Sequence, residues 1–383
     1  MDDLPKVEKA NQVVGSLIDF GRNFPPPSPF VELAIADSFA HLRKTDIASA
    51  IRFPRFTGTE KDRRAGAGWL SRRLGQEPEA DRIVLANGSQ SILTMLMARY
   101  IKPGGVLLTE ALTYPAIKPL SALFDIRLHG VAIDDKGIMP DSLDEECRRL
   151  HGNARALYCM PTLHNPTSAT MSEGRRQDIA KIARQHDLAI FEDDIYGVLS
   201  TDAPPPLATY APERSWYFVG LSKSLASQLR VAYVLAPSKA LAEDAFWPSV
   251  RTTTWMVAPL IAEIASHWLS NTIAGEILQS VRVETQTRRS IAESALGMTF
   301  NIDPSSYHLW INLPSGLRLA DFSDAARQRG VVVGAGKSFA VGCSHGDTRF
   351  RVGLGVPGSH HELRKGLTII SELIKAQPSG AVR

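Results

Sequence analysis

WYFVGLSKSLASQLRVAYVLA, residues 216–236, joins two apolar runs through a polar segment that contains Ser222, Lys223 and Arg230. Short continuous apolar runs are typical of strands buried on both faces of a sheet. The runs at 216–220 and 231–236 therefore predict two strands of one sheet. A lone lysine after a strand is most often a solvated surface group, so the meaning of Lys223 depends on the residues that lie beside it.

The segments before and after this stretch predict an α/β fold. Five earlier apolar runs read as strands, at residues 82–86, 105–109, 127–133, 156–160 and 188–192. They alternate with helical patterns such as 172–186, where Ser172 is placed as an N-cap. This alternation predicts a mostly parallel sheet with helices on both faces. The late strands follow one another closely in the sequence, which is compatible with an antiparallel pair among them. After about residue 285, short strands at 308–314, 330–336 and 349–355 and a helix at 319–329 suggest a smaller α+β lobe.

Composition excludes several classes of protein. The chain has 383 residues, with 44% hydrophobic and 22% charged, which excludes a mostly disordered chain and favours two lobes. A net charge of +3 indicates no basic surface for nucleic acid. Three cysteines are too few for a disulfide framework, the N-terminus does not resemble a signal peptide, and the apolar runs are too short to cross a bilayer. We therefore expect a cytoplasmic protein that binds neither nucleic acid nor membrane.

Polar segments follow three of the expected strands. Asn87-Gly88-Ser89-Gln90 opens a helix, where backbone N–H groups favour a phosphate, although a capped turn is the commoner use of such a segment. His164-Asn165-Pro166-Thr167 and Asp193-Asp194-Ile195-Tyr196 each follow a strand. Ligands bind at the carboxyl ends of strands in sheets of this type. We therefore expect these segments and Lys223 to share one site.

GAGKS, residues 334–338, imitates the end of a phosphate-binding P-loop. That motif requires glycine five residues before its Gly-Lys glycine, and this chain has Val331 there. We interpret the segment as a glycine-rich turn.

Taken in order, the motifs IDFGRNFPP, RFPRFTGTEKDR, NGSQ, TYP, HNPT, DDIY, SKSLASQLR and RFRVG resemble those of the fold-type I, class I/II aminotransferases that depend on pyridoxal 5′-phosphate (PLP). The closest similarity is to the aminotransferase domain of MocR-type regulators, over residues 18–373. The resemblance implies a PLP-dependent transferase fold. It implies a PLP-binding large domain at 46–285, a small domain at 286–383, and an N-terminal arm at 1–45 that joins the small domain.

The resemblance also implies a role for each site residue. Lys223 would form the Schiff base with PLP and then move the substrate proton. Asp193 would keep the pyridine nitrogen protonated, and Asn165 and Tyr196 would hydrogen-bond the ring oxygen O3′. Tyr114 would stack on the ring. Arg351, with Asn165 beside it, would bind the substrate carboxylate. The phosphate would be held by Gly88, Ser89, Gln90, Ser222 and Arg230. No metal is implied.

Several of these assignments have competitors. Asp194 is an alternative to Asp193, and Arg349 to Arg351, since alternation along a strand puts both arginines on one face. His164 is expected beside the site and not in catalysis. His186 and His308 have no partner signal and are expected to be structural, whereas Trp255 could line the substrate pocket or simply pack.

The sequence departs from the family pattern at four places. Phe53 stands where relatives usually carry a tyrosine that reaches the phosphate of the neighbouring subunit. Gly220 replaces a serine or threonine that usually contacts the phosphate. Ser227-Gln228 replaces a common Pro-Gly, and Ala232 a common glycine. The first two suggest unusual cofactor anchoring.

The function implied is transfer of an amino group between an amino acid and a 2-oxo acid by a ping-pong mechanism, in a homodimer with shared active sites. The alternatives are another PLP-dependent reaction on an amino acid (elimination, decarboxylation, cyclisation or replacement) and a non-catalytic PLP or effector sensor. About 17 residues precede IDFGR, too few for the winged-helix domain of a MocR-type regulator. The chain is then either a free enzyme or a fragment, and Met1 with the acidic start favours a free enzyme. We expect a neutral or apolar substrate side chain; Arg22 and Arg251 are candidates by position for binding a second carboxylate.

Overall fold

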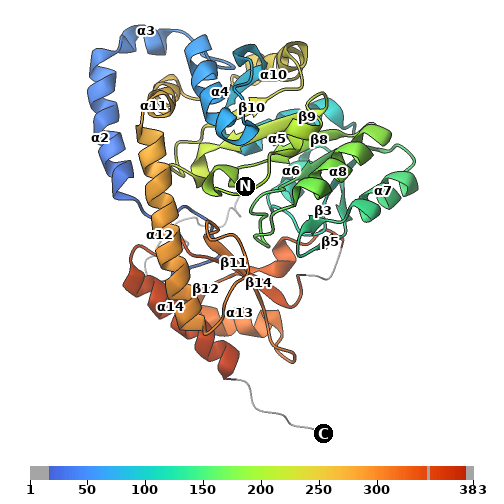
Figure 1. Cartoon of the computed structure of the whole chain (residues 1–383), viewed down its shortest axis with the longest axis vertical. Helices are drawn as coiled ribbons and strands as arrows, with labels where there is room; N and C mark the ends of the chain where they lie inside the picture. Colours follow the sequence, from blue (N-terminus) through green and yellow to red (C-terminus); the bar gives the residue numbers. More distant parts are fainter. Residues whose placement is uncertain (1–16, 343–345, 377–383) are drawn as a thin grey trace, which may run out of the picture.

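The computed structural model describes residues 17–342 and 346–376, apart from the side chains at 247, 248, 251 and 252. A large α/β lobe and a smaller lobe lie one above the other in Figure 1, with helix α12 (Ile273–Leu296) running from one to the other. Among the described residues, no helix has the length and apolar character needed to cross a bilayer.

The large lobe is built on one seven-stranded sheet. Its order is β2 (Ile83–Ala86), β10 (Ala232–Leu235), β9 (Ser215–Gly220), β8 (Ala189–Asp193), β7 (Ala154–Cys159), β3 (Val106–Glu110) and β4 (Arg127–Val131). Strand β10 is antiparallel to both of its neighbours, and the other pairs are parallel. All residues of β3 and β9 are buried. The mostly parallel sheet predicted from the sequence is therefore confirmed, and so is an antiparallel pair among the late strands.

Helices cover this sheet, and some of them begin at a side chain that caps the helix start. Ser172 accepts a hydrogen bond from Arg175 N at 3.4 Å, which confirms it as the N-cap of α8. Thr59 and Asp62 form a reciprocal capping box at the start of α4. The helices of this lobe are α3 (Ile47–Arg52), α4 (Glu60–Leu74), α5 (Gly88–Tyr100), α6 (Ile117–Leu123), α7 (Pro140–Arg149), α8 (Glu173–Gln185), α9 (Leu207–Tyr210), α10 (Lys239–Thr253) and α11 (Pro259–Ser270).

The small lobe has an antiparallel sheet of β11 (His308–Asn312), β14 (Arg349–Gly353) and β13 (Gly334–Ala335). Helices α13 (Leu319–Gln328) and α14 (His360–Lys375) pack beside it, and α14 packs along α12. Residue 285, the boundary expected from the sequence, lies inside the continuous helix α12. The division into domains therefore stays a prediction.

The N-terminal arm connects the two lobes. Its strand β1 (Ile18–Asp19) pairs in parallel with β12 (Val331–Val332) of the small lobe, and helix α2 (Pro29–Lys44) then follows the outer edge of the molecule in Figure 1. Between them the arm runs close to the chain that follows β14. A Cβ atom on Gly353 would collide with the carbonyl oxygen of Arg22, and one on Gly355 with that of Phe24. Glycine at both positions therefore permits a close backbone approach that fixes residues 21–24 beside the sheet.

Candidate active site

One cavity at the carboxyl ends of β7, β8 and β9 collects most of the residues that the sequence singled out. It is lined by nine of the expected cofactor-binding residues: Ser89, Gln90, Tyr114, Asn165, Asp193, Tyr196, Ser222, Lys223 and Arg230. The arm contributes Phe24 to the wall. Segments far apart in the sequence thus meet at the edge of the sheet where ligands of such folds bind.

Lys223 lies in a short turn that directly follows β9. Its Nζ donates to the carbonyl oxygen of Asn23 in the arm, and it lies 5.4 Å from the centre of the Phe24 ring. Tyr307 Oη donates to the carbonyl oxygen of Lys223 at 3.0 Å. Burial, followed by the nearby Arg351 and Arg230, lowers the pKa of Lys223 to about 8. A larger share of the amine is therefore neutral and nucleophilic than in an exposed lysine.

Asp193 is the last residue of β8, and its carboxylate is buried. It accepts hydrogen bonds from Tyr158 Oη at 3.1 Å and from Ile195 N at 3.2 Å. Burial raises its pKa to about 7 against the effect of these two donors. Within the described residues it forms no salt bridge, so its environment favours a cationic group that enters the cavity.

Asp194 has a different environment, although it is the next residue. Arg73 Nε donates to its Oδ2 at 3.1 Å, and Tyr217 Oη donates to the same atom at 2.8 Å. Arg73 also donates to the carbonyl oxygens of Ala203 and Pro204, so the whole group ties α4 to the loop after β8. Asp194 is therefore already paired, and Asp193 is the carboxylate that faces the cavity.

A cradle for an anion lies at the start of α5. Gly88 has φ +78°, and a Cβ atom on it would lie 2.9 Å from a terminal nitrogen of Arg230, whose own φ is +54°. Ser89 Oγ is buried and has no hydrogen-bond partner among the described residues. Exposed N–H groups at a helix start, an arginine and an unpaired hydroxyl together suit a phosphate group.

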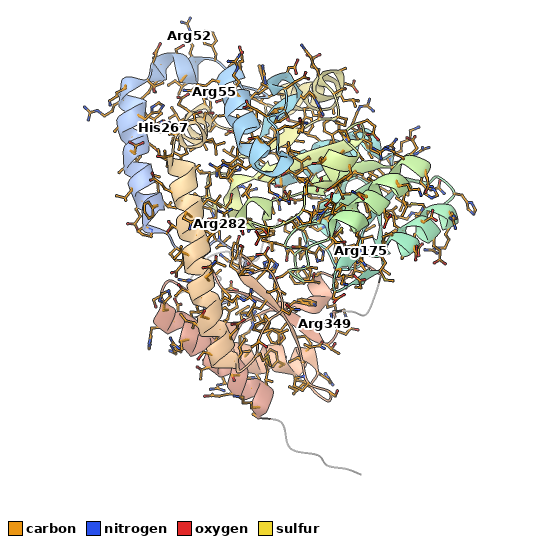
Figure 2. All side chains as sticks on the ribbon, in the orientation of Figure 1. Arg52, Arg55, Arg175, His267, Arg282 and Arg349 are labelled. Atoms are coloured by element: carbon orange, nitrogen blue, oxygen red, sulfur yellow. The ribbon has the colours of Figure 1, made fainter. Side chains whose placement is uncertain are left out.

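Arg351 lies on β14 of the small lobe and contacts Asn165, a residue of the cavity wall. Its two terminal nitrogens donate to Asn165 Oδ1 at 2.7 Å and to the Gly21 carbonyl at 2.6 Å, and its Nε is buried and unpaired among the described residues. Arg349, labelled on the small lobe in Figure 2, instead donates to Asn312 Oδ1 at 2.9 Å. Alternation places both arginines on one face of β14, but their partners differ: Arg351 contacts Asn165 of the cavity wall, and Arg349 contacts Asn312.

Residues 18–370 match the family Aminotransferase class I and II. The chain belongs to this family. It is 30% identical to an uncharacterized HTH-type transcriptional regulator of Bacillus subtilis, over 80% of this chain and 65% of that protein, so it spans slightly less than two thirds of that relative. It is 24% identical to aromatic-amino-acid aminotransferase 1 of Thermococcus litoralis, over 94% of this chain and 88% of the relative.

Solved aminotransferase structures share the fold. An archaeal alanine:glyoxylate aminotransferase superposes with a TM-score of 0.85 and 24% identity, over 96% of this chain and 94% of the other. The kynurenine aminotransferase of Pyrococcus horikoshii, solved with pyridoxamine phosphate (PMP), superposes with a TM-score of 0.84 and 22% identity, over 98% and 95%. The predicted PLP-dependent transferase fold is therefore confirmed.

The cofactor of this aminotransferase family is pyridoxal 5′-phosphate, and this chain has groups that fit each part of it. The unpaired Ser89 hydroxyl and the Arg230 guanidinium suit the phosphate. The buried Asp193 carboxylate suits a protonated pyridine nitrogen, and the Lys223 amine suits the aldehyde carbon. Gly220 lies against the phosphate cradle, because a Cβ atom there would be 3.0 Å from Ser89 Oγ.

Two histidines considered from the sequence, His186 and His164, have hydrogen-bond partners in the structure. The sequence gives no partner signal for His186, and in the structure its Nε2 lies 2.7 Å from Asp144 Oδ1. His164 is buried, with Nε2 3.0 Å from the Leu112 carbonyl and Nδ1 2.8 Å from the Thr167 hydroxyl. Burial lowers its pKa to about 4, which suits a neutral residue beside the site.

Two polar residues next to the site, Asn23 and His308, were not among the expected site residues. Asn23 Nδ2 lies 2.9 Å from Tyr196 Oη and 3.3 Å from His308 Nδ1. The sequence shows no partner signal for His308, and the structure supplies these partners. Asn23 lies inside the quoted IDFGRNFPP motif, but only the folded chain brings it to Tyr196.

Three residues considered from the sequence lie away from the cavity, and the side chain of a fourth is not among those that the structure describes. Trp255 is 36% exposed and does not line the cavity. Phe53 ends α3 and is 60% exposed. Arg22 is largely exposed and pairs with Asp19 at 3.2 Å, so it does not supply a second cation to the cavity. The side chain of Arg251 lies outside the described residues.

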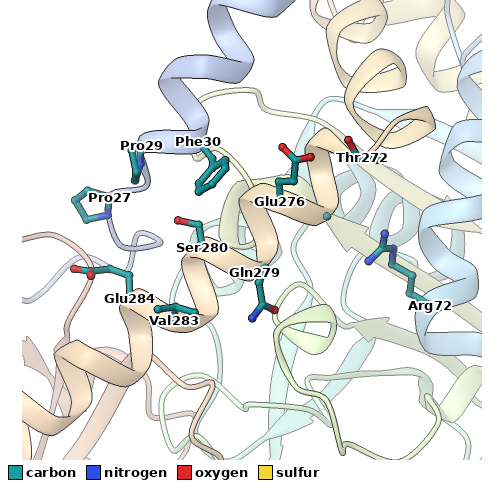
Figure 3. Close-up of a pocket in the computed structure, with 11 residues that line it drawn as sticks. Pro27, Pro29, Phe30, Arg72, Thr272, Glu276, Gln279, Ser280, Val283 and Glu284 are labelled. Atoms are coloured by element: carbon teal, nitrogen blue, oxygen red, sulfur yellow. The ribbon is translucent and has the colours of Figure 1, made fainter.

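A second hollow, shown in Figure 3, lies between the start of α2, helix α12 and the end of α4. Pro29 and Phe30 line it from the arm, Val283 from α12, and Arg72 from α4. It contains no counterpart of the Lys223 and Asp193 pair, so we assign the chemistry to the cavity at the sheet edge.

Proposed function

We propose that this protein is a PLP-dependent aminotransferase that moves an amino group between an amino acid and a 2-oxo acid by a ping-pong mechanism. The observation that carries the proposal is that Lys223 and Asp193 line one cavity and that Arg351 donates to Asn165, which lines the same cavity. Each group has the chemistry that one step requires: a nucleophilic amine, a carboxylate without a salt-bridge partner among the described residues, and a cationic fork.

The residues divide the work as follows. When bound, PLP supplies the electron sink that makes the substrate Cα proton removable. Lys223 would hold the cofactor covalently, and its amine, whose pKa is lowered to about 8, would move that proton when it is free. Asp193 balances the positive pyridine nitrogen, and Tyr196 donates to the ring oxygen, with the free Asn165 amide beside it. Since Asn165 Oδ1 accepts from Arg351, its Nδ2 is the group available to the ring.

Substrate orientation follows from Arg351. Its planar fork matches a carboxylate in two parallel hydrogen bonds, and the Phe339 ring packs 4.9 Å from the guanidinium. A substrate carboxylate would replace the Gly21 carbonyl as an acceptor. Phe24 and Phe339 give the neighbourhood an apolar character, which supports the neutral or apolar substrate side chain inferred from the sequence.

We further propose a cytoplasmic homodimer with shared active sites. Support comes from exposed apolar side chains on α2 and at the end of α3: Leu33 (66%), Phe39 (65%), Ile51 (57%) and Phe53 (60%). Exposed apolar surface of large area often marks an interface. The hollow in Figure 3 is lined by Phe30, which lies on α2 together with Leu33 and Phe39. Two buried free thiols, Cys147 and Cys159, support a reducing compartment.

The test is an amino-donor screen. Single amino acids are added to the PLP-loaded protein, and conversion of the bound cofactor to PMP is followed by absorbance; pyruvate or 2-oxoglutarate should then reverse it. Conversion and reversal with at least one donor support the proposal.

One finding favours a second candidate, a PLP or effector sensor: the similarity to a transcriptional regulator. A sensor would bind amino acids or PLP and yet transfer no amino group. A panel without any turnover, in a protein that still binds PLP through Lys223, would decide for the sensor.

A further inference from the structure

Asn23 brings a buried amide from the N-terminal arm to the hydroxyl of Tyr196. It is 6% exposed, and its Nδ2 lies 2.9 Å from Tyr196 Oη and 3.3 Å from His308 Nδ1. Its Oδ1 is buried without a partner among the described residues. The contact joins residues 173 positions apart, and it stands outside the roles assigned so far.

His308 decides which way the Asn23 amide faces. Its Nε2 lies 3.1 Å from the carbonyl oxygen of His164, which can only accept, so Nε2 carries the proton. Burial and the nearby Arg351 lower the pKa of His308 to about 3, so the ring is neutral and Nδ1 is an acceptor. Ser306 Oγ lies 3.5 Å from Nδ1, but it also donates to the His308 carbonyl at 3.0 Å. An N–H of Asn23 must therefore face Nδ1.

The same geometry fixes the direction of the next hydrogen bond. With one Nδ2 hydrogen on His308, the second points at the oxygen of Tyr196. The tyrosine hydroxyl accepts that bond, so its own hydrogen is free to be donated into the cavity that it lines. Donation into the hydroxyl oxygen also polarises its O–H bond and makes it a better donor.

We propose that Asn23 is a positioning residue, which forces Tyr196 to act as a hydrogen-bond donor toward the ring oxygen of the bound cofactor. This inference rests on the role proposed above for Tyr196. Two features hold the arm around Asn23 in place. Gly353 and Gly355 allow the backbone of Arg22 and Phe24 to approach closely, and β1, which precedes Asn23, pairs with β12.

The bound cofactor itself reports on this hydrogen bond. A donor to the ring oxygen stabilises the form in which that oxygen is negative, and so lowers the pH midpoint at which the absorbance of the lysine-bound cofactor changes. Charged and titratable groups around Tyr196 also act on this midpoint: Arg351, Asp193 and Tyr114 face Tyr196, and Lys223 and His164 face His308. The comparison therefore uses variants that leave all of these unchanged.

The experiment is an absorbance titration of the PLP-loaded protein across pH, without substrate, for wild type, Asn23→Leu, Tyr196→Phe and the double variant. Tyr196→Phe should raise the midpoint by about 1–2 units, the value of a charge-assisted hydrogen bond. Asn23→Leu should raise it by roughly 0.5–1 unit, since it weakens that bond without removing it. In the Tyr196→Phe background, Asn23→Leu should add nothing.

Ser28→Ala is the matched control. Ser28 is a buried polar residue of the same arm, and it donates to Ser280 Oγ at 2.9 Å away from the cavity. Loss of the Ser28 hydroxyl should leave the midpoint unchanged. A shift that occurs in the Asn23 variants alone is then due to loss of the Asn23 amide and not to a general loosening of the arm. Asn23→Ala, which adds no apolar bulk, tests the same step if Asn23→Leu does not fold.

The outcomes are distinct. An unshifted midpoint in Tyr196→Phe refutes the proposed role of Tyr196 and with it this inference. A shift in Tyr196→Phe but none in the Asn23 variants overturns the inference alone. An equal Asn23 shift with and without the Tyr196 hydroxyl also overturns it, because Asn23 would then act by another route.

Discussion

Arg73 and Asp194 form a buried ion pair, with Arg73 Nε 3.1 Å from Asp194 Oδ2. Tyr217 donates to the same carboxylate oxygen at 2.8 Å. The neighbouring Asp193 receives only Tyr158 Oη and the backbone N–H of Ile195. Two adjacent carboxylates therefore have opposite tasks: one is held by a protein cation, and the other is available to a cation of the cofactor.

The first prediction contrasts Asp193→Asn with Asp194→Asn. Asp193→Asn should keep the fold and reduce kcat by about 100-fold or more, because an amide cannot balance a protonated pyridine nitrogen and a change of that size is roughly 3 kcal/mol. Asp194→Asn should lower the free energy of unfolding by about 3–5 kcal/mol, because it leaves Arg73 buried without its counter-charge. Urea unfolding and steady-state kinetics measure the two effects.

The opposite result would exchange the roles assigned to Asp193 and Asp194. If Asp194→Asn were stable and inactive while Asp193→Asn stayed active, Asp194 would be the pyridine partner.

The second prediction concerns covalent attachment. Borohydride reduction of the PLP-loaded protein, followed by digestion and mass spectrometry, should place the pyridoxyl label on Lys223 alone, and Lys223→Ala should remove it. Lys337, in the GAGKS segment that imitates a P-loop, is the matched control, and Lys337→Ala should keep full labelling. A label on any lysine other than Lys223 contradicts the assignment.

Much of the fold could be predicted because its signals are local. The strands of the large sheet are continuous apolar runs, since both faces are covered, and such runs are visible in the sequence. The site followed from one rule, that polar residues after parallel strands meet at one edge of the sheet. This rule predicts that Asn165, Asp193 and Lys223 share one site, and all three line one cavity.

The contacts that could not be predicted are those that depend on distant packing. Asn23 and His308 are 285 residues apart, and their approach depends on the pairing of β1 with β12 and on the absence of a side chain at Gly353. The pairing of Asp194 likewise depends on Arg73, which α4 brings from 121 residues away. No periodicity within either segment carries that information.

The third prediction separates the two arginines of β14. Arg351→Ala should raise the KM for amino acids by about 10- to 150-fold, since a charge-assisted hydrogen bond contributes about 1.5–3 kcal/mol. Arg349→Ala, which removes a contact to Asn312, should leave KM nearly unchanged. Amines without a carboxylate serve as the second comparison. Equal losses for amines and amino acids would show that Arg351 supports structure and does not bind the carboxylate.

The fourth prediction concerns Glu110, a buried carboxyl group at the end of β3. Its Oε1 accepts from Met160 N at 2.7 Å, its Oε2 has no partner among the described residues, and burial raises its pKa from 4.5 to about 8. Because the folded pKa lies above the unfolded one, the group contributes stability that is fully present below about pH 4.5 and is lost as the pH rises through about 8.

Glu110→Gln should therefore flatten the decline in unfolding free energy between about pH 5 and 8, by up to about 1.4 kcal/mol per pH unit. Urea unfolding of the cofactor-free protein at several pH values measures this slope. Glu372→Gln, at an exposed residue paired with Arg329, is the control and should leave the slope as in the wild type. An unchanged slope in Glu110→Gln would show that the carboxyl group is already ionised in the folded protein over this range.

The last prediction concerns Phe53. The resemblance places an aromatic hydroxyl at this position on the cofactor phosphate of the neighbouring subunit, and this chain keeps the ring without the hydroxyl. Phe53 is 60% exposed at the end of α3, among the apolar side chains that we propose as the dimer surface. Gly220 removes a second usual contact, and a side chain there would crowd Ser89 Oγ at 3.0 Å. The phosphate therefore depends on the start of α5, Arg230 and Ser222.

Phe53→Tyr should tighten binding of PMP by roughly 1–2 kcal/mol, because the new hydroxyl donates to a charged acceptor. The pyridoxamine form is the right probe, since it lacks the covalent bond to Lys223 and is anchored mainly by its phosphate. Dissociation constants from fluorescence titration, with the oligomeric state checked by sedimentation, measure the effect. Phe39→Tyr, an equally exposed aromatic residue on α2, is the matched control and should leave the constant unchanged. A dimeric Phe53→Tyr variant with unaltered affinity would show that Phe53 does not face the phosphate, or that another group already occupies that contact.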